Sequence, residues 1–356
     1  MRGEKLAALD FALDGQMVRP LLEMAAKEYW GTTVQVENVA VKIIRSRSSR
    51  CVICYNIDIY DSVTKLRKQV GIFGKVFRPR RGEKTFELME QLWEHGFDAK
   101  SKDGIFIPDP MYFFSDKCLM LQEKIPGLPA KDLLKIDPSN YNNMRIVART
   151  IAKLHRTPIV PGRNYTVQDH LQRCHPRYPF LAMACPELEE KIEFIVQGAL
   201  QLTQKYACIE PCATHGDFHL RQIHIEKENA WLIDFDAMCY ADPAADIGNL
   251  LVFLKSKAQR HRRHWVYIEE FVDEYISIMG PDILKRVPIY EALTHLRRAC
   301  KVLRFQKKNW RKIVTEMIDS GAACIESAFL EKDAIYSSDA HSSGKPELDN
   351  KILEYK

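Results

Sequence analysis

The sequence predicts an α+β protein in which a small β-rich region precedes a larger helical one. Two observations predict this order. Over residues 34–77, apolar residues alternate with polar ones and β-branched residues are frequent. After Ile125–Gly127 the apolar residues take helical spacing, and residues 146–154 are the clearest example. We therefore expect an N-terminal lobe with a leading helix at residues 1–122 and a helical lobe at residues 123–332.

The N-terminal lobe is expected to hold several strands and one helix. Period-two alternation marks Val39–Ile43 and Ile53–Ile59, and a further strand is expected at Val70–Phe77. Helical spacing then appears at Thr85–Glu94, because Phe86, Met89 and Leu92 recur on one face. Two more extended segments are expected at Met111–Phe114 and Cys118–Leu121.

Composition indicates a globular protein of the cytoplasm. The 356-residue chain is 46% apolar with a formal net charge of +5, which is too mild to indicate a nucleic-acid partner. No apolar run reaches about 18 residues, so we expect no membrane span, and Met1–Lys5 lacks an export signal. The ten cysteines are expected to stay reduced. The polar, Ser-rich segment at residues 333–356 is not expected to pack.

A polar cluster stands out in the second half of the chain. His215–His219 reads H-G-D-F-H, Gln222 follows, and Leu232–Asp236 reads L-I-D-F-D after a short loop. This spacing suits phosphoryl transfer, in which one carboxylate receives a hydroxyl proton while an amide and another carboxylate hold magnesium. Protein kinases carry the same arrangement as H-R-D-x-x-x-x-N followed by D-F-G. Gln222 stands where asparagine is expected.

These motifs resemble the aminoglycoside phosphotransferase and choline kinase superfamily, whose members share the protein-kinase-like fold. The resemblance is carried by T-H-G-D-F-H, W-L-I-D-F-D and D-P-A-A-D-I-G-N-L-L within residues 214–251. Upstream, M-L-Q-E-K-I-P-G-L-P resembles the segment that connects the lobes, and G-I-F-G-K-V-F resembles the strand that carries the lysine. The resemblance as a whole covers residues 40 to 255. It implies a two-lobe fold with a nucleotide site between a β-rich and a helical lobe.

The cluster residues then take definite expected roles. Asp217 would orient the acceptor hydroxyl and take its proton as the catalytic base. Asp234 would bind Mg²⁺, and Gln222 would offer an amide oxygen on a longer side chain, directly or through water, unless this metal site is weakened. Asp236 is either an outer metal ligand or part of the hydrogen bonding of the loop. His215 is expected to fix the loop rather than to carry protons.

A helix should follow the cluster. Asp242 and Pro243 give it an N-cap and a proline at the first helical position. Asp246 lies in its first turn. We expect Asp242 and Asp246 to support the catalytic loop structurally.

The nucleotide is expected to contact the N-terminal lobe. Lys75 follows an apolar run and is the candidate for holding the α- and β-phosphates. Its carboxylate partner is left open between Glu87 and Glu90, and Glu87 is preferred. The adenine would meet the backbone of Glu123 and Ile125, a placement that the resemblance implies.

The loop that would cover the phosphates has no glycine. It reads R-S-R-S-S-R over residues 45–50, and Ser48 and Ser49 could contact a phosphate with help from guanidinium groups. A solvated surface turn is the alternative.

The resulting hypothesis is an Mg²⁺-dependent phosphotransferase that moves the γ-phosphate of ATP to a hydroxyl on a small molecule. The alternative is a nucleotide-binding pseudoenzyme with a regulatory or scaffolding role, which Gln222 and the missing glycines motivate. A protein kinase proper is disfavoured, because the D-P-A-A-D-I-G helix replaces a segment ending in A-P-E. The acceptor, the preference for ATP over GTP and the oligomeric state stay open.

Overall fold

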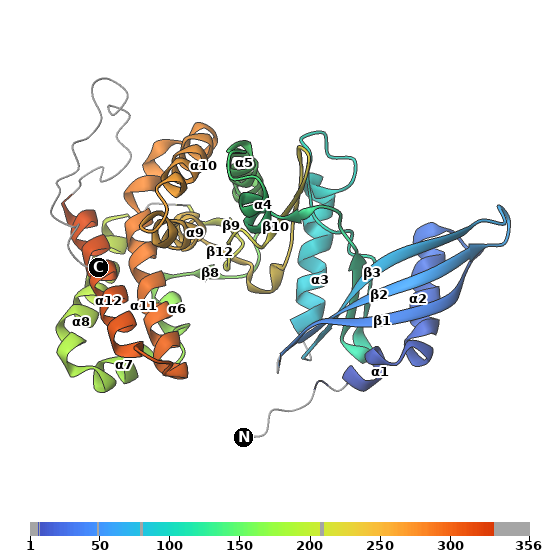
Figure 1. The fold of residues 1–356 in the computed structure, drawn as a ribbon, viewed down its shortest axis with the longest axis horizontal. Coiled ribbons are helices and arrows are strands. Elements are labelled where there is room, and N and C mark those ends of the chain that lie inside the picture. Colours follow the sequence, from blue (N-terminus) through green and yellow to red (C-terminus); the bar gives the residue numbers. More distant parts are fainter. Residues whose placement is uncertain (1–5, 7, 48–49, 79–80, 207–209, 331–356) are drawn as a thin grey trace. The chain divides into compact units, whose positions relative to one another are not determined.

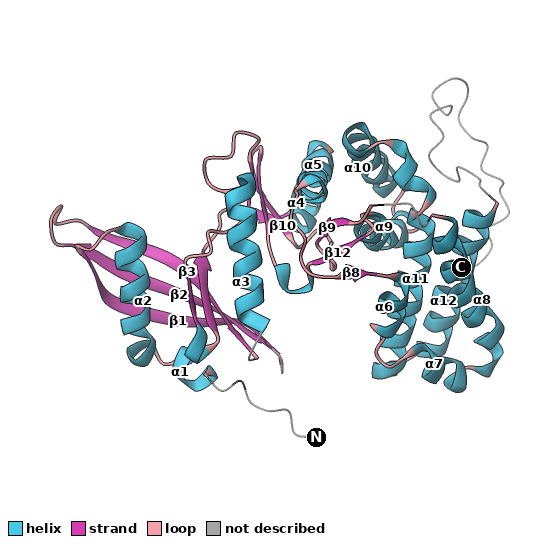
Figure 2. Ribbon diagram, turned by 180° about the vertical axis from the view of Figure 1, so that it is seen from behind, coloured by secondary structure: helices cyan, strands magenta, loops and turns pink. Residues whose placement is uncertain are grey.

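The structure is a computed structural model, and it describes residues 6, 8–47, 50–78, 81–206 and 210–330 (Figure 1). Within these residues the expected α+β content is confirmed (Figure 2). The chain divides into two compact units, one of residues 1–170 with 208–281 and one of residues 171–207 with 282–356. The expected lobe boundary at residue 122 falls inside the first unit and stays a prediction. Residues 333–356, which were not expected to pack, lie outside the described residues.

The first unit opens with two helices that precede the main sheet. They are α1 (Leu9–Leu13) and α2 (Gly15–Trp30). Asp14 caps α2, because its side chain accepts hydrogen bonds from the backbone N–H groups of Gln16 (2.9 Å) and Met17 (3.1 Å). Figure 1 shows α2 running along one face of the sheet that follows.

The main sheet is antiparallel and has the order β1-β2-β3-β6-β5. Its strands are β1 (Val34–Arg47), β2 (Arg50–Asp61), β3 (Arg67–Phe77), β5 (Tyr112–Phe114) and β6 (Leu119–Glu123). The strands predicted from alternation are therefore present, and each runs longer than its apolar pattern. The hairpin between β1 and β2 closes at Arg47, which pairs with Arg50.

Alternation along β2 and β3 gives the sheet two different faces. Ile53 and Tyr55 of β2, together with Ile72 of β3, belong to the apolar core that α2 covers. The neighbouring positions point to the other face. Since Val52 pairs with Lys75 in the antiparallel register, that second face carries the Lys75 side chain.

The helix expected at Thr85–Glu94 begins earlier. It is α3 (Arg81–Leu92), and in the following residues, Trp93–Phe97, the backbone leaves the helical conformation at His95 and at Gly96, which has a φ of +85°. Thr85, Leu88 and Met89 are on its buried face. The helix ends in this way because Gly96 adopts a left-handed conformation that glycine reaches without steric cost.

Short strands frame the polar cluster in the rest of the first unit, where the sequence indicated mostly helix. One sheet has the order β4-β11-β10-β7 and another the order β8-β12-β9. Their strands are β4 (Ile105–Phe106), β7 (Leu128–Pro129), β8 (Asn164–Tyr165), β9 (Cys212–Thr214), β10 (Ile223–Glu226), β11 (Asn229–Leu232) and β12 (Cys239–Ala241).

Helices pack around these short strands. The first unit contains α4 (Ala130–Ile136), α5 (Asn142–Arg156), α9 (Ala244–Ala258) and α10 (Arg263–Met279). The predicted helix at residues 146–154 is the centre of α5, whose apolar residues are almost all buried. Helix α6 (Val167–Gln172) lies where the two units join along the chain.

The second unit is helical in its described residues. It contains α7 (Tyr178–Ala184), α8 (Glu189–Lys205), α11 (Val287–Phe305) and α12 (Trp310–Phe329). Gly198 of α8 faces α12, where a Cβ would come within 2.4 Å of Ile325, so a glycine is needed for this close helix contact. No described helix is both long enough and apolar enough to cross a lipid bilayer.

Candidate active site

The segment H-G-D-F-H-L-R-Q forms the loop between β9 and β10. Its first residue, His215, is fully buried and its imidazole Nε2 lies 2.9 Å from the carbonyl oxygen of Ile233. Gly216 follows with a φ of +75°. An added Cβ at this glycine would collide with the carbonyl group of Ala237, so only glycine fits here. The loop is thus joined tightly to the segment after β11.

Asp246, in the first turn of α9, fixes the backbone of this loop. Its Oδ2 accepts a hydrogen bond from the N–H of His215 (2.6 Å), and its Oδ1 accepts one from the N–H of Gly216 (2.9 Å). The side chain is only 1% exposed. Two buried backbone donors therefore depend on one carboxylate, which makes it expensive to remove.

A second layer of polar residues holds Asp246 in turn. His155 of α5 contacts the Asp246 carboxylate through Nε2 (3.2 Å), and its Nδ1 lies 2.7 Å from the hydroxyl of Tyr275 in α10. Burial would raise the pKa of Asp246, but the hydrogen bond and charge of His155 and the contacts with His215 together lower it. The carboxylate is thus ionised within the protein interior.

Asp217, the predicted catalytic base, is partly exposed on this fixed loop. Its backbone N–H lies 3.4 Å from Nδ1 of His215. Among the described residues we find no hydrogen bond or ion pair to its carboxylate. The carboxylate is therefore available to a ligand, while the backbone beneath it is held by Asp246.

Lys75 and Arg50 reach the site from the main sheet. Arg50 pairs with Phe77 and Val52 pairs with Lys75, so the alternation places both cations on the face opposite the α2 core. Lys75 is 7% exposed. Both side chains extend to the same two carboxylates, those of Asp234 and Asp236.

These contacts form a compact network of two cations and two carboxylates. Lys75 Nζ lies 3.1 Å from Asp234 Oδ1 and 3.2 Å from Asp236 Oδ1. The Arg50 guanidinium binds Asp234 through both nitrogens, at 2.7 Å to Oδ1 and 2.9 Å to Oδ2. It also forms an ion pair with Asp236. This fork geometry is the strong form of an arginine–carboxylate contact.

Asp234 is strained as well as charged. Its φ is +72°, a left-handed conformation that non-glycine residues seldom adopt and that is frequent at functional sites. Burial would raise its pKa, but the charges of Lys75 and Arg50 hold the pKa well below its ordinary range. Burial likewise would lower the pKa of Arg50, and the two aspartates raise it instead. Both carboxylate and guanidinium are thus stabilised as ions.

Gln222 lies beside Asp234 and is 6% exposed. Its side-chain Nε2 donates to Asp234 Oδ2 over 3.4 Å, and its backbone carbonyl accepts from the N–H of Ile233 at 2.9 Å. The structure therefore brings Gln222, Asp234 and Asp236 together, as the spacing predicted. In this arrangement the amide contacts Asp234 through nitrogen.

The expected pairing of Lys75 with Glu87 is not present. Among the residues that the structure describes, no ion pair or hydrogen bond joins Lys75 to Glu87 or Glu90. Both glutamates are exposed, because the buried face of α3 is formed by other positions. Lys75 pairs with Asp234 and Asp236 in their place.

The connecting segment begins at Glu123, the last residue of β6, and continues through Ile125, and both residues are partly buried. The N–H of Glu123 donates to the carbonyl of Asp109 at 3.0 Å, so this donor is already engaged. An adenine at this segment would have to use the carbonyl groups of Glu123 and Ile125 or the N–H of Ile125. Further on, Gly127 has a φ of +77°, and an added Cβ would lie 2.5 Å from the carbonyl oxygen of Ile225 in β10.

The remaining predicted positions are Asp242, Ser48 and Ser49. Asp242 precedes α9, which begins at Ala244, and its side chain accepts a hydrogen bond from the N–H of Ala244 at 2.9 Å. Ser48 and Ser49 lie outside the described residues.

The donor set fits a magnesium ion that a nucleotide helps to hold. No group of three or more His, Cys, Asp or Glu side chains able to hold a metal occurs in the described part of the chain. Mg²⁺ is commonly bound by one or two carboxylates together with substrate phosphates. Asp234 and Asp236, which share Arg50 and Lys75, supply such a pair of hard oxygen ligands.

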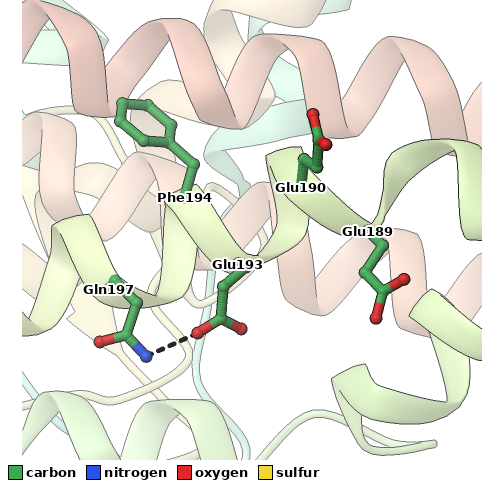
Figure 3. Close-up of a pocket in the computed structure, with 5 residues that line it drawn as sticks. All are labelled: Glu189, Glu190, Glu193, Phe194 and Gln197. Atoms are coloured by element: carbon green, nitrogen blue, oxygen red, sulfur yellow. Dashed lines mark hydrogen bonds between the residues drawn. The ribbon is translucent and has the colours of Figure 1, made fainter.

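A separate pocket lies on α8 in the second unit. Figure 3 shows its lining residues Glu189, Glu190, Glu193, Phe194 and Gln197. Gln197 donates a hydrogen bond to Glu193 at 2.7 Å. None of the predicted site residues lines this pocket.

Sequence reasoning missed the roles of three residues. His155 and Tyr275 lie on the buried, mostly apolar faces of α5 and α10. The only signal in the sequence was a polar side chain at a position of that face where an apolar one is expected. Arg50 was expected to approach phosphates, not Asp234 and Asp236. The strand register could have placed it beside Lys75, but not across from these aspartates.

Comparisons with known proteins agree with this geometry. The sequence matches the phosphotransferase enzyme family over residues 73–276, more than half of the chain. No curated protein is significantly similar.

Solved structures with a similar fold have low sequence identity. A choline/ethanolamine kinase family protein from Mesorhizobium loti is 14% identical, with a TM-score of 0.54 over 81% of this chain and 88% of that one. The aminoglycoside phosphotransferase APH(4)-Ia, in a ternary complex with ADP and hygromycin B, is 12% identical with a TM-score of 0.55 (87% and 98% covered). The amicoumacin kinase hAmiN is 15% identical with a TM-score of 0.53 (88% and 95% covered).

The expected kinase-like fold is therefore confirmed. The match covers the strand of Lys75, the catalytic loop, both aspartates of the cation network and α9 with Asp246. The chain belongs to the phosphotransferase enzyme family.

Proposed function

We propose that this protein transfers the γ-phosphoryl group of ATP to a hydroxyl group of a small molecule in an Mg²⁺-dependent reaction. One observation carries the proposal. Asp217 presents a carboxylate that makes no hydrogen bond or ion pair among the described residues, on a loop whose backbone Asp246 fixes. Lys75 and Asp234 lie beside that loop. Family membership supports the same reaction class.

Asp217 would act on the acceptor. Its carboxylate would accept a hydrogen bond from the acceptor hydroxyl and hold that oxygen in line with the γ-phosphorus. As the new O–P bond forms and the bond to the ADP leaving oxygen breaks, the hydroxyl proton would pass to Asp217. Since little covalent chemistry falls to the protein, positioning would supply much of the rate.

Lys75 and the aspartates would act on the nucleotide. The Lys75 ammonium would contact the α- and β-phosphates, and Asp234, Asp236 and Gln222 would hold magnesium. That ion, when bound, would neutralise charge on the β- and γ-phosphates. For Gln222 to offer its oxygen, its side-chain amide would have to turn from its present contact with Asp234.

The remaining nucleotide contacts follow the connecting segment. The backbone of Glu123 and Ile125 would meet adenine, with the carbonyl group of Glu123 as acceptor because its N–H is engaged by Asp109. Ser48 and Ser49 would help to cover the phosphates. Two structures of similar fold hold ADP with hygromycin B, and AMP-PNP with Ca²⁺ and Ami. A cytoplasmic location stays part of the proposal.

A pseudoenzyme that binds nucleotide without turnover is the second candidate. The observation that favours it is the occupation of both carboxylates by Arg50 and Lys75, together with the amide N–H contact of Gln222. Such a protein would bind ATP but release no ADP.

A direct assay separates the two candidates. ADP release and ³¹P NMR would be followed with ATP, Mg²⁺ and a panel of sugars, amino sugars, amino alcohols and nucleosides. Acceptor-dependent ADP release that disappears in Asp217→Asn is expected for the enzyme. Nucleotide binding by calorimetry, with no phosphorylated product from any acceptor, would favour the pseudoenzyme.

A further inference from the structure

Arg50 occupies the carboxylates that the proposed function assigns to a metal ion. Its guanidinium binds both oxygens of Asp234 and also contacts Asp236. The Arg50 side chain is 18% exposed, and those of Asp234 and Asp236 are 17% and 20% exposed. This is a largely desolvated contact, and so it is stronger than an ordinary surface ion pair.

The oxygen atoms of Asp234 are fully used by this network. Oδ1 accepts from Arg50 and Lys75, and Oδ2 accepts from Arg50 and Gln222. A divalent cation would need the same lone pairs and would be repelled by the guanidinium. Metal and Arg50 therefore compete for one site.

Arg50 has an alternative partner within reach of its position in the sheet. It is the first residue of β2, next to the hairpin tip that carries the exposed Arg45 and Arg47. A planar guanidinium matches the oxygens of a phosphate as well as those of a carboxylate. A nucleotide placed on Lys75 would bring phosphates to this face of the sheet.

We propose that Arg50 exchanges partners when nucleotide binds: it holds Asp234 and Asp236 in the free protein and transfers to the nucleotide phosphates as metal enters. The protein then binds divalent metal weakly by itself, and nucleotide and metal strengthen the binding of each other. This inference rests on the proposed nucleotide site but not on turnover. A protein that binds nucleotide without phosphorylating anything would still test it.

The test uses Mn²⁺ as the probe, followed by its EPR signal, with the full-length protein and no acceptor. In the wild type we expect weak Mn²⁺ binding that tightens at least tenfold when AMP-PNP is added. In Arg50→Met we expect Mn²⁺ alone to bind at least tenfold more tightly than in the wild type. Its AMP-PNP affinity should fall, so the coupling between the two ligands should shrink in both directions.

Matched variants separate this exchange from general electrostatics. Lys42→Met removes an exposed cation of β1, outside the segment at residues 45–50, and should leave Mn²⁺ affinity within twofold. Asp234→Asn should lose Mn²⁺ binding in both backgrounds. Circular dichroism checks that each variant is folded, and Arg50→Lys, which keeps the charge but loses the fork, should give an intermediate Mn²⁺ affinity. Unchanged or weaker Mn²⁺ binding by folded Arg50→Met and Arg50→Lys would overturn the proposal.

Helices α4 and α9 both approach the catalytic loop. Helix α4 follows β7, which pairs with β10, and the N–H of Lys131 donates to the carbonyl of Leu220 in the loop at 3.1 Å. Arg221 is the next loop residue and is exposed. On α9, Phe253 contacts His219 edge to face at 6.5 Å. The loop is thus bordered by both helices.

Cations gather where α4, α9 and the loop meet. Lys257 lies one turn after Phe253, and burial followed by the charges of Lys131, Lys135 and Arg221 lowers its pKa. The acid in this group is Asp132, which forms an ion pair with Lys135 at 2.6 Å. A net positive surface therefore adjoins the loop that carries Asp217.

We infer that the acceptor carries an anionic group, a carboxylate or a phosphate, in addition to its hydroxyl. The contact of Phe253 with His219 brings α9 and Lys257 beside the residues that follow Asp217, so an acceptor whose hydroxyl lies at Asp217 could present a second group to these cations. Positive charge there attracts an anionic acceptor and repels a polycation. This inference rests on the proposed function for the identity of the ligand as an acceptor, while the anion site itself can be measured without turnover.

The probes are inorganic phosphate and acetate, titrated by calorimetry into protein saturated with AMP-PNP and Mg²⁺. Filling the nucleotide site first removes phosphate binding at Lys75. We expect anion binding that weakens at least fivefold in Lys257→Gln and in Arg221→Gln, and not in Lys42→Gln, an exposed lysine on β1. Tighter binding of phosphate than of acetate would indicate a phosphate ester, and the reverse a carboxylate. Anion affinity that is absent, or equal in all variants, would overturn the inference whatever the result of the turnover assay.

Discussion

The catalytic loop and the β1–β2 hairpin contribute to the candidate active site by different means. The loop is held from below: Asp246 accepts two backbone hydrogen bonds from it, and His155 and Tyr275 support Asp246 in turn. Arg50, in the hairpin, is held by ion pairs to Asp234 and Asp236. One contact is buried and irreplaceable, whereas the other can be exchanged for another anion. The difference suggests a fixed part for positioning and an adjustable part for ligand binding.

The substitution with the largest expected effect tests whether the catalytic loop supplies the proton acceptor. Asp217→Asn removes the proton acceptor without disturbing the backbone, so turnover should fall by about a thousandfold. AMP-PNP affinity by calorimetry should stay within twofold of the wild type. If Asp217→Asn keeps substantial acceptor-dependent turnover, Asp217 is not the catalytic base and the fixed loop does not have the role assigned to it.

The next effect tests how rigid the loop must be. Gly216→Ala places a Cβ against the carbonyl group of Ala237 on top of an unfavourable φ of +75°. Gly96→Ala is the matched control, since Gly96 has a left-handed backbone with a φ of +85° and a ψ of +22° but open space around it. The control should cost about 1 kcal/mol from backbone strain alone. Urea unfolding should give a clearly greater loss for Gly216→Ala, and equal losses would mean that the loop can move aside.

A smaller effect tests the support beneath the loop. Asp246→Asn weakens two charge-assisted hydrogen bonds in a fully buried place, and should lower the free energy of unfolding by about 2 kcal/mol. Arg50→Met should lower the free energy of unfolding by less, because Lys75 still pairs with both aspartates. Equal destabilisation by the two variants would erase the distinction between fixed and adjustable parts.

The stabilisation that Asp246 provides should depend on pH. The pKa of Asp246 is lower in the folded protein than its ordinary value of about 3.9 in an unfolded chain. Its contribution is therefore present in full above that value and is lost as the pH falls through the folded pKa. Urea unfolding of wild type and Asp246→Asn should converge below about pH 4. A difference that persists unchanged in acid would show that the charge of Asp246 is not what stabilises the loop.

The smallest effect provides a reference for surface charge. Glu37 forms an ion pair with Arg67 at 2.9 Å on an exposed part of the sheet. Exposed pairs contribute little because water screens them. Glu37→Gln should leave the urea midpoint, nucleotide affinity and turnover unchanged. A measurable change in any of the three would indicate that exposed ion pairs of the sheet contribute to stability or to the site.

The sequence predicted much of the fold and the members of the site, but not their partners. Period-two alternation located the strands of the main sheet, and motif spacing brought Gln222, Asp234 and Asp236 together. These features depend on local pattern, which a sequence carries directly. The pairing of Lys75 with Asp234 in place of Glu87, and the support of Asp246 by His155, join residues far apart in the chain. Such contacts depend on how elements pack, so spacing alone could not predict them.

Gly127 gives the connecting segment a mechanical consequence. Its backbone lies so close to Ile225 of β10 that no side chain fits between them. The segment expected to meet adenine and the strand that leaves the catalytic loop are thereby pressed together as one piece. A side chain at Gly127 would therefore displace β10 as well as the segment itself, so one glycine sets the spacing between them.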